Sequence, residues 1–264
     1  MNNDAEEWQR WTDARTASVS SPHGMLALIG THWLGPEAVE IPGVPGRWSA
    51  DGGTVRVAAV AADGLRAGAA AGEGTPVDGT LELHPDTHPE HGTAWVGDLL
   101  LVPIEREGEL ALRVFDPAAE NRVTFAGISV FPYAPEWSVP AVFTPYETGD
   151  RTVNVPNADG RERPLAVTGQ IDFRLGGESY TLTVSRSGEL LSGVLSDGGS
   201  GHETHRFRFI TLPEPDAEGR TVLDFNRAYL PPCAFADHFI CPFPPPGNKL
   251  PVVVRAGEKA VVWG

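Results

Sequence analysis

Apolar and polar residues alternate with a period of two along much of the chain after Met25. The alternation is clear in Thr54-Val-Arg-Val-Ala-Ala-Val, in Thr80-Leu-Glu-Leu-His and in Glu109-Leu-Ala-Leu-Arg-Val-Phe. Successive side chains of a strand point to opposite faces of its sheet, so this period predicts half-buried strands. We therefore expect a mainly β fold, either an antiparallel β-sandwich or a partly closed barrel.

Turn signals separate these strands. Residues 170–175 and 178–184 both have strand character, and Gly176-Gly177 lies between them. Paired glycines supply the positive φ angles of a two-residue turn, so the segment predicts a β-hairpin. Further turn dipeptides lie at Asp51-Gly52, Asp63-Gly64, Asp159-Gly160 and Asp197-Gly198.

The N-terminal segment predicts a helix over about residues 4–17. Asn3 or Asp4 can cap it, with a glutamate three positions later, and Trp8, Trp11 and Arg15 lie on one face. We interpret it as a helix that docks on the β-region through its two indoles.

The 264 residues are interpreted as a single domain. It consists of the helix, a β-region over about 25–225 and a proline-rich segment over about 226–264. The segment 131–140 is rich in proline and aromatic residues. Aromatic side chains have apolar area to bury, so we expect a packed crossover there and not a free linker.

The net charge is −15, and no lysine- or arginine-rich run is present. Nucleic acid and anionic membranes are therefore not expected as partners. The polar, acidic N-terminus and the lack of a long apolar run predict a cytoplasmic protein, in which the two cysteines are thiols; a disulfide remains an alternative. The sequence does not predict an oligomeric state.

The last part of the chain gathers residue types that are rare elsewhere. Cys233 and Cys241 are the cysteines, Lys249 and Lys259 are the lysines, and seven prolines lie between residues 231 and 251. Each proline fixes φ near −65°, so the segment predicts a stiff strap that holds the polar groups it carries.

This block resembles the C-terminal signature of the bacterial and archaeal family catalogued as domain of unknown function 1684. The resemblance implies membership but no activity, because none is assigned to that family. Looser similarity continues upstream, at Trp8-Gln-Arg and at Phe131-Pro-Tyr-Ala-Pro-Glu-Trp. The residues that carry the main resemblance are Asp224-Phe-Asn-Arg-Ala-Tyr, Pro232-Cys-Ala-Phe, Cys241-Pro-Phe-Pro-Pro, Asn248-Lys-Leu-Pro-Val and Ala256-Gly-Glu-Lys.

Our leading hypothesis is a small-molecule-binding protein with a pocket beside this strap and with acid/base catalysis as an option. Arg208 would bind an anionic group of the ligand, and Glu203 or His205 would exchange protons. The predicted catalytic residues are Glu203, His205 and Asp224. The predicted ligand-binding residues are Arg208, Asn226, Tyr229 and Asn248.

Two other functions stay open. One is a structural or partner-binding module that presents Phe235, Phe239 and Phe243 in an exposed apolar patch. The other is a thiol- or metal-dependent hydrolase that uses Cys233 and Cys241. The Cys and His spacings match no standard zinc motif, and no phosphate-binding glycine pattern occurs, so neither a metal nor a cofactor is predicted.

Overall fold

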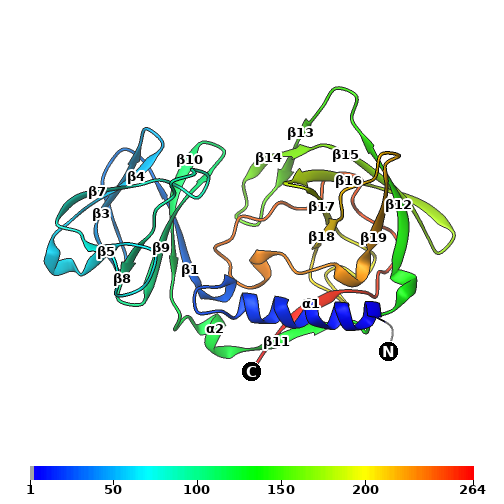
Figure 1. Ribbon diagram of the computed structural model, residues 1–264, viewed down its shortest axis with the longest axis horizontal. Helices are drawn as coiled ribbons and strands as arrows, with labels where there is room; N and C mark the ends of the chain where they lie inside the picture. Colours follow the sequence, from blue (N-terminus) through cyan, green and yellow to red (C-terminus); the bar gives the residue numbers. More distant parts are fainter. Residues whose placement is uncertain (1–2) are drawn as a thin grey trace. The chain divides into compact units, whose positions relative to one another are not determined.

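The computed structural model describes residues 3–264, and most of its regular structure is β (Figure 1). The chain divides into two compact units. The insert unit comprises residues 18–124. The terminal unit combines the residues before Ser18 with Phe125–Gly264, so it is built from both ends of the chain.

The insert unit contains two antiparallel sheets about one core. The sheet orders are β1-β10-β9-β8-β5-β6 and β2-β3-β4-β7. Trp48, Val57 and Leu112 are fully buried in a cluster to which both sheets contribute, which makes this unit sandwich-like. Its elements are η1 (Met25–Ala27), β1 (Leu28–Leu34), β2 (Val39–Ile41), β3 (Val44–Asp51), β4 (Thr54–Ala59), η2 (Ala61–Asp63), β5 (Leu65–Ala67), β6 (Thr75–Pro76), β7 (Gly79–Leu83), β8 (Ala94–Val96), β9 (Leu99–Arg106), β10 (Glu109–Phe115) and α2 (Glu120–Thr124).

The terminal unit is dominated by a six-stranded antiparallel sheet of order β18-β17-β16-β15-β12-β19. Its two end strands approach each other, so the sheet curls into a partly closed barrel. Two ribbons, β11-β20 and β13-β14, complete the unit. Its elements are α1 (Asn3–Val19), β11 (Phe125–Val130), η3 (Pro135–Trp137), β12 (Ser138–Pro145), β13 (Arg151–Pro156), β14 (Glu162–Val167), β15 (Gly169–Leu175), β16 (Glu178–Ser187), β17 (Leu190–Leu195), β18 (Arg208–Leu212), β19 (Arg220–Asp224), η4 (Phe225–Arg227), η5 (Pro232–Ala234) and β20 (Glu258–Trp263).

The predicted mainly β fold is confirmed, and each of the two predicted architectures occurs in one unit. The predicted hairpin is formed by β15 and β16, which are joined by Gly176 and Gly177 with φ values of 60° and 91°. Buried and exposed residues alternate along the whole of β15, as the period of two requires. The structure leaves the single-domain interpretation as a prediction, because two cores do not decide whether the chain unfolds in one step.

The predicted N-terminal helix is confirmed as α1, which ends two residues later than expected, at Val19. Its Trp8 indole donates to the backbone oxygen of Asn226 at 2.9 Å. Arg15 donates twice to the Glu258 carboxylate, at 3.0 and 3.1 Å, and Glu258 is completely buried. The helix is therefore fastened by a bidentate ion pair as well as by an indole.

The glycine before Glu258 allows the backbone to place the Glu258 carboxylate in its buried position. Gly257 has a φ of 77°, and a Cβ there would lie 2.4 Å from the Ala228 backbone oxygen. Only glycine allows this approach without displacing the backbone. The next residue then donates its N–H to the same Ala228 oxygen at 2.8 Å, while its carboxylate accepts the Leu230 N–H at 2.7 Å.

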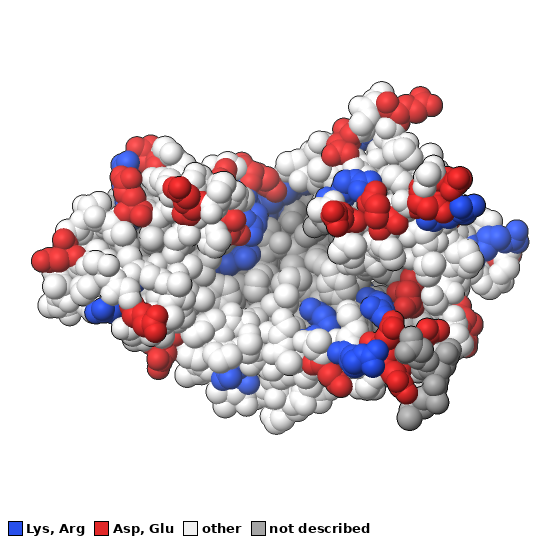
Figure 2. Space-filling view, viewed as in Figure 1, with Lys and Arg blue, Asp and Glu red and all other residues white. Residues whose placement is uncertain are grey.

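Acidic side chains are spread over both units on the face shown in Figure 2, with basic side chains among them. This distribution is typical of a solvated, charged surface and not of a surface on which charges of one sign form a single patch. Among the helices of residues 3–264, none combines the length and the apolar composition that crossing a membrane requires.

Candidate functional site

A cavity of about 260 Å³ lies in the terminal unit, on the face of the barrel sheet that the proline strap covers. Four hydroxyl-bearing residues line it, together with apolar residues, and no charged side chain is among its lining residues. The lining consists of Leu165, Val167, Thr183, Ser185, Ser192, Gly193, Val194, Phe209, Tyr229, Pro242 and Pro245.

Tyr229 is held in this cavity by its backbone and its ring. Its N–H and C=O exchange two 2.8 Å hydrogen bonds with Phe209, which extends pairing from β18 to the chain after η4. The two rings meet edge to face at 5.9 Å. The Tyr229 hydroxyl lies 3.3 Å from the Thr211 hydroxyl, and the Arg15 guanidinium stands 4.9 Å above the ring. These contacts fix the ring before any ligand arrives.

Asn248 creates the gap into which the cavity opens. β16 pairs with β17 only from Ser185 onward, where Ser185 lies opposite Ser192. Extending that register would place Thr183 opposite Val194, but the Asn248 side chain stands between them. Its amide oxygen accepts the Thr183 N–H, and its NH₂ donates to the carbonyls of Thr183 and Val194, each at 2.8 Å. The side chain thus replaces the missing ladder bonds while the strands separate.

The strap closes the cavity with prolines. Pro242 forms a bridge with Asn157, and Phe243 donates its N–H to the Pro156 oxygen at 2.8 Å. Asn248 donates its N–H to the oxygen of Pro245 at 3.0 Å. Because proline lacks an N–H, its apolar ring can face the cavity without leaving an unpaired donor there.

Of the seven predicted site residues, only Tyr229 lines this cavity. Asn248 contacts the backbone of two lining residues and is fully buried, so in this structure it positions the cavity wall. The other five lie elsewhere in the terminal unit, and the functional roles assigned to all seven stay predictions.

Arg208 lies in the interior of the terminal unit, with no exposed surface. Its Nη2 donates to Asp197 at 2.7 Å and to the Val254 oxygen at 3.0 Å, and its Nη1 donates to the oxygens of Ala256 and Glu258. Burial lowers the pKa of Arg208, and the Asp197 carboxylate opposes that shift. Binding an external anion would require Arg208 to give up these partners.

Asp224 and Asn226 form a second, separate group at η4. Asp224 caps η4 by accepting the Asn226 N–H at 3.0 Å, and it also accepts the Asn226 side-chain NH₂ at 2.9 Å. The Asn226 amide further exchanges hydrogen bonds with the backbone of Ala134 at 3.1 and 3.0 Å. These bonds tie η4 to the loop before η3, which gives both side chains a structural task.

Glu203 and His205 come from the loop before β18. Glu203 is exposed and forms a bidentate ion pair with Arg255 at 2.8 and 2.9 Å, which holds the pKa of Glu203 below its usual value. His205 donates its backbone N–H to Lys259 at 2.7 Å, and its ring packs edge to face on Phe207 at 5.7 Å. The two side chains therefore do not meet Asp224 in one catalytic group.

Comparison with known proteins identifies the terminal unit. Residues 123–259 match the family described as protein of unknown function DUF1684. The chain belongs to this family. A solution NMR structure of an uncharacterised protein from Haloarcula marismortui is 33% identical over 51% of this chain and 77% of that chain, with a TM-score of 0.43. No curated protein matches the chain significantly.

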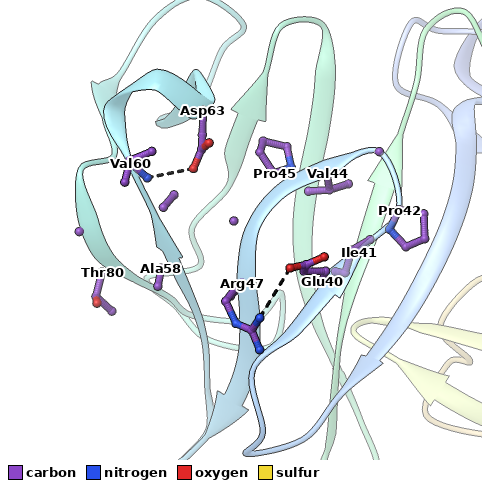
Figure 3. A pocket seen from close by; sticks show the side chains of 14 residues that line it. Glu40, Ile41, Pro42, Val44, Pro45, Arg47, Ala58, Val60, Asp63 and Thr80 are labelled. Atoms are coloured by element: carbon purple, nitrogen blue, oxygen red, sulfur yellow. Dashed lines mark hydrogen bonds and ion pairs between the residues drawn. The ribbon is translucent and has the colours of Figure 1, made fainter.

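This DUF1684 chain has a larger hollow in its insert unit, outside the matched residues. It measures about 850 Å³ and lies over β3, β4 and the segment around η2. Figure 3 shows its polar groups paired locally: Glu40 lies 3.6 Å from Arg47, and Asp63 accepts the Val60 N–H at 2.9 Å. The hollow is shallow, and its charged residues Glu40 and Arg47 are exposed, so we place the candidate site at the more enclosed cavity beside Tyr229.

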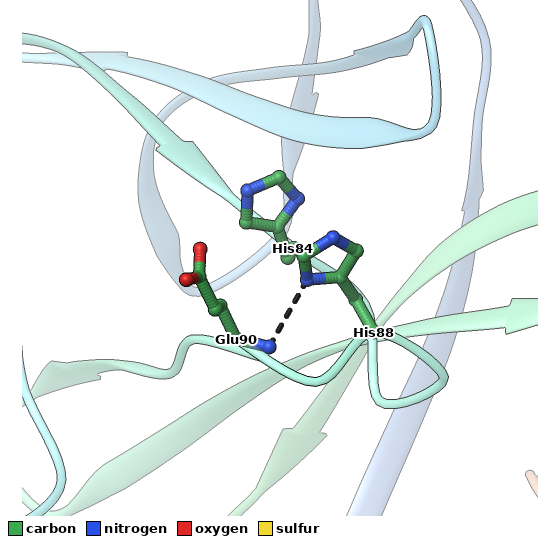
Figure 4. A group of neighbouring side chains, drawn as sticks. All are labelled: His84, His88 and Glu90. Carbon is green, nitrogen blue, oxygen red and sulfur yellow. Dashed lines mark hydrogen bonds between the residues drawn. The ribbon is translucent and has the colours of Figure 1, made fainter.

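The insert unit also brings together His84, His88 and Glu90, whose ligand atoms lie within 4.8 Å of one another (Figure 4). The two imidazoles are stacked at 4.0 Å with planes 14° apart, and His88 Nδ1 accepts the Glu90 N–H at 3.1 Å. A metal ion binds an imidazole in the plane of its ring, so two stacked rings must rotate before both can hold one ion. The group is therefore not a preformed metal centre.

Sequence reasoning missed most of the cavity wall. Thr183 and Ser185 alternate with the buried residues Leu182 and Val184. Their period of two indicates a polar face, which a sequence alone assigns to solvent. The available signal was the proline strap that covers this face, because a rigid proline segment must pack against another part of the protein.

Proposed function

We propose that the terminal unit binds a small uncharged molecule in the cavity beside Tyr229. The single observation that carries the proposal is the composition of the lining: four hydroxyl-bearing residues, Thr183, Ser185, Ser192 and Tyr229, line a space that is otherwise bounded by apolar residues. Binding sites of small molecules are mostly apolar with a few convergent polar groups, and this lining has that composition.

The lining favours an uncharged ligand over the anionic ligand that the sequence suggested. A buried anion needs a cation or several donors to offset its desolvation, and no Lys, Arg or His is among the lining residues. Arg208, the predicted anion-binding group, donates to Asp197 and to backbone oxygens instead. A ligand with an apolar ring or chain and one or two hydroxyl or carbonyl groups fits the lining best.

The cavity is preorganised, which supports binding over a purely mechanical role. Asn248 and the prolines hold the strands and the strap apart without the ligand, so little ordering entropy is lost on binding. The alternative of an exposed aromatic patch has less support, because Phe235 and Phe239 are buried. Acid/base catalysis by Glu203, His205 and Asp224 stays a prediction, since none of them lines the cavity.

The test is to fill the cavity. Thr183→Leu places a larger side chain in the space, whereas Thr152→Leu makes the same change at an exposed position of β13 in the same unit. A library of small hydroxylated and carbonyl compounds is screened by thermal shift against the native protein and both variants.

We expect compounds that stabilise the native protein and Thr152→Leu to lose their effect on Thr183→Leu, because ligand stabilisation requires binding to the folded state. A stabilising compound whose shift is equal in all three proteins would place its site elsewhere and refute the proposal. Isothermal titration of the best compound then measures affinity directly.

A further inference from the structure

Cys233 and Cys241 lie together, next to but outside the lining of the cavity. Cys233 is in η5, and its backbone N–H donates to Cys241 Sγ at 3.3 Å. Both are thiols, with exposed fractions of 8% and 2%. Cys241 directly precedes Pro242, and its carbonyl accepts the Ala158 N–H at 2.9 Å, so the strap fixes its position.

A cation stands beside Cys233. Arg206 Nη2 lies 3.9 Å from Cys233 Sγ, and the guanidinium is held over the ring of Phe243 at 4.6 Å and over that of Phe207 at 5.4 Å. Arg206 itself is exposed, so the charged group of this pair reaches solvent. Stacking on two rings keeps the charge close to the sulfur.

These neighbours favour the thiolate. The hydrogen bond from Cys241, followed by those from His205 and Arg206, lowers the pKa of Cys233 to about 5, although burial opposes the shift. Because the thiolate and not the thiol is the nucleophile, Cys233 has the electrostatic environment of a reactive cysteine, whereas Cys241 is the more buried partner.

We propose that Cys233 and Cys241 form a reactive dithiol that a hydroperoxide oxidises reversibly to an intramolecular disulfide. The Cys233 thiolate attacks the terminal oxygen of the hydroperoxide and the O–O bond breaks; the leaving alkoxide or hydroxide takes up the proton that the thiol lost on ionising and departs as an alcohol or water. Cys233 is then a sulfenic acid. The Cys241 sulfur attacks the Cys233 sulfur, the S–O bond breaks and water leaves. Two thiols and one hydroperoxide thus give a disulfide, an alcohol and water, and an external dithiol restores the reduced pair.

The geometry supports the second step as well as the first. Cys241 Sγ accepts the Cys233 backbone N–H at 3.3 Å, and a hydrogen bond with Cys241 is the main cause that lowers the pKa of the Cys233 thiol, so the two thiols are neighbours. Each thiol is flanked by prolines, at positions 231 and 232 before Cys233 and at position 242 after Cys241, which restricts backbone motion away from this arrangement. This dithiol is independent of the proposed ligand and can stand if the cavity binds nothing.

The first experiment measures alkylation of the native protein by iodoacetamide between pH 5 and 9, with the site read by mass spectrometry. The same chain in urea is the control, since an unfolded thiol titrates near pH 8.5. We expect alkylation of folded Cys233 to have its midpoint at least about 2 pH units below that of the unfolded chain. Arg206→Gln, an exposed substitution, should move the midpoint upward.

The second experiment treats the protein with hydrogen peroxide. The native chain should lose two hydrogens and recover them with dithiothreitol, whereas Cys241→Ser should stop at a sulfenic acid that dimedone labels on Cys233. Equal alkylation midpoints in the folded and unfolded chains, or two thiols that stay intact in peroxide and unalkylated throughout, would overturn the proposal and leave a buried, inert pair.

Discussion

Replacing Asn248 by alanine should destabilise the terminal unit strongly, because this fully buried side chain makes three partly buried hydrogen bonds there. The substitution leaves the Thr183 N–H and the carbonyls of Thr183 and Val194 without these partners. A net contribution of about 1 kcal/mol for each bond gives a loss of about 3 kcal/mol in the free energy of unfolding. Water entering from the adjacent cavity would offset part of the loss.

The assay is equilibrium unfolding in urea, followed by tryptophan fluorescence. Trp137 packs against the core of the terminal unit and reports on it. Asn154→Ala removes an exposed asparagine from β13 of the same unit and should change stability by less than about 0.5 kcal/mol. If Asn248→Ala loses less than about 1 kcal/mol, the amide does not hold the strands apart as we infer.

Asn248→Asp sharpens this test. A carboxylate at this position accepts the Thr183 N–H but turns its second oxygen toward the carbonyls of Thr183 and Val194. Burial and these oxygens disfavour the charged form. We therefore expect this variant to gain stability relative to the native protein as the pH falls and the carboxyl group becomes a donor. A stability difference that does not vary with pH would contradict this account of the amide.

Three further predictions concern the rest of the chain. Arg15→Ala should lower the free energy of unfolding by about 3–5 kcal/mol, because it leaves the buried Glu258 carboxylate without its ion-pair partner. The exposed Arg10→Ala in the same helix should be nearly neutral, and equal urea midpoints for the two variants would be inconsistent with the ion pair. The lowered pKa of Cys233 means that the native state binds fewer protons than the unfolded one between about pH 5 and 8.5. The free energy of unfolding should therefore rise with pH across that window, and it should rise more in the native protein than in Cys233→Ser. Equal pH dependence of the two proteins would contradict the prediction. If the chain unfolds as a single domain, as its sequence predicts, Val57→Ala in one core and Leu223→Ala in the other should lower one common calorimetric transition; two transitions, each moved by one substitution, would separate the units.

The elements that the sequence predicts well depend on neighbours along the chain. The β15–β16 hairpin needs only two alternating segments and two glycines, and α1 needs only its caps and its apolar face. Such interactions join residues that are close together in the sequence, so local composition and hydrophobic periodicity predict them. The same local signals do not say which strands share a sheet, and the division into two units was accordingly not predicted.

The candidate site depends on contacts that are distant in sequence. Asn248 acts on Thr183 and Val194, which are 65 and 54 residues away, and no local pattern marks either partner. Arg208 was predicted to meet a ligand because its guanidinium can bind an anionic group. Its partner Asp197 lies 11 residues earlier, in what reads as a turn dipeptide, and the pair is wholly buried. The chemical character of such residues is visible in a sequence, but their partners are not.

The ion pair between Arg15 and Glu258 also connects the segment that matches the family to the N-terminal helix α1. The matched residues begin at 123, at the end of the insert unit, and they include Glu258 but not Arg15. Within that segment the Glu258 carboxylate accepts the Leu230 N–H and lies in the electrostatic field of Arg208, but its ion-pair partner is Arg15 of α1. A completely buried carboxylate without a cation is strongly unfavourable. The first and last elements of the sequence therefore form one structural unit, and residues 18–124 are an insertion between two parts that depend on each other.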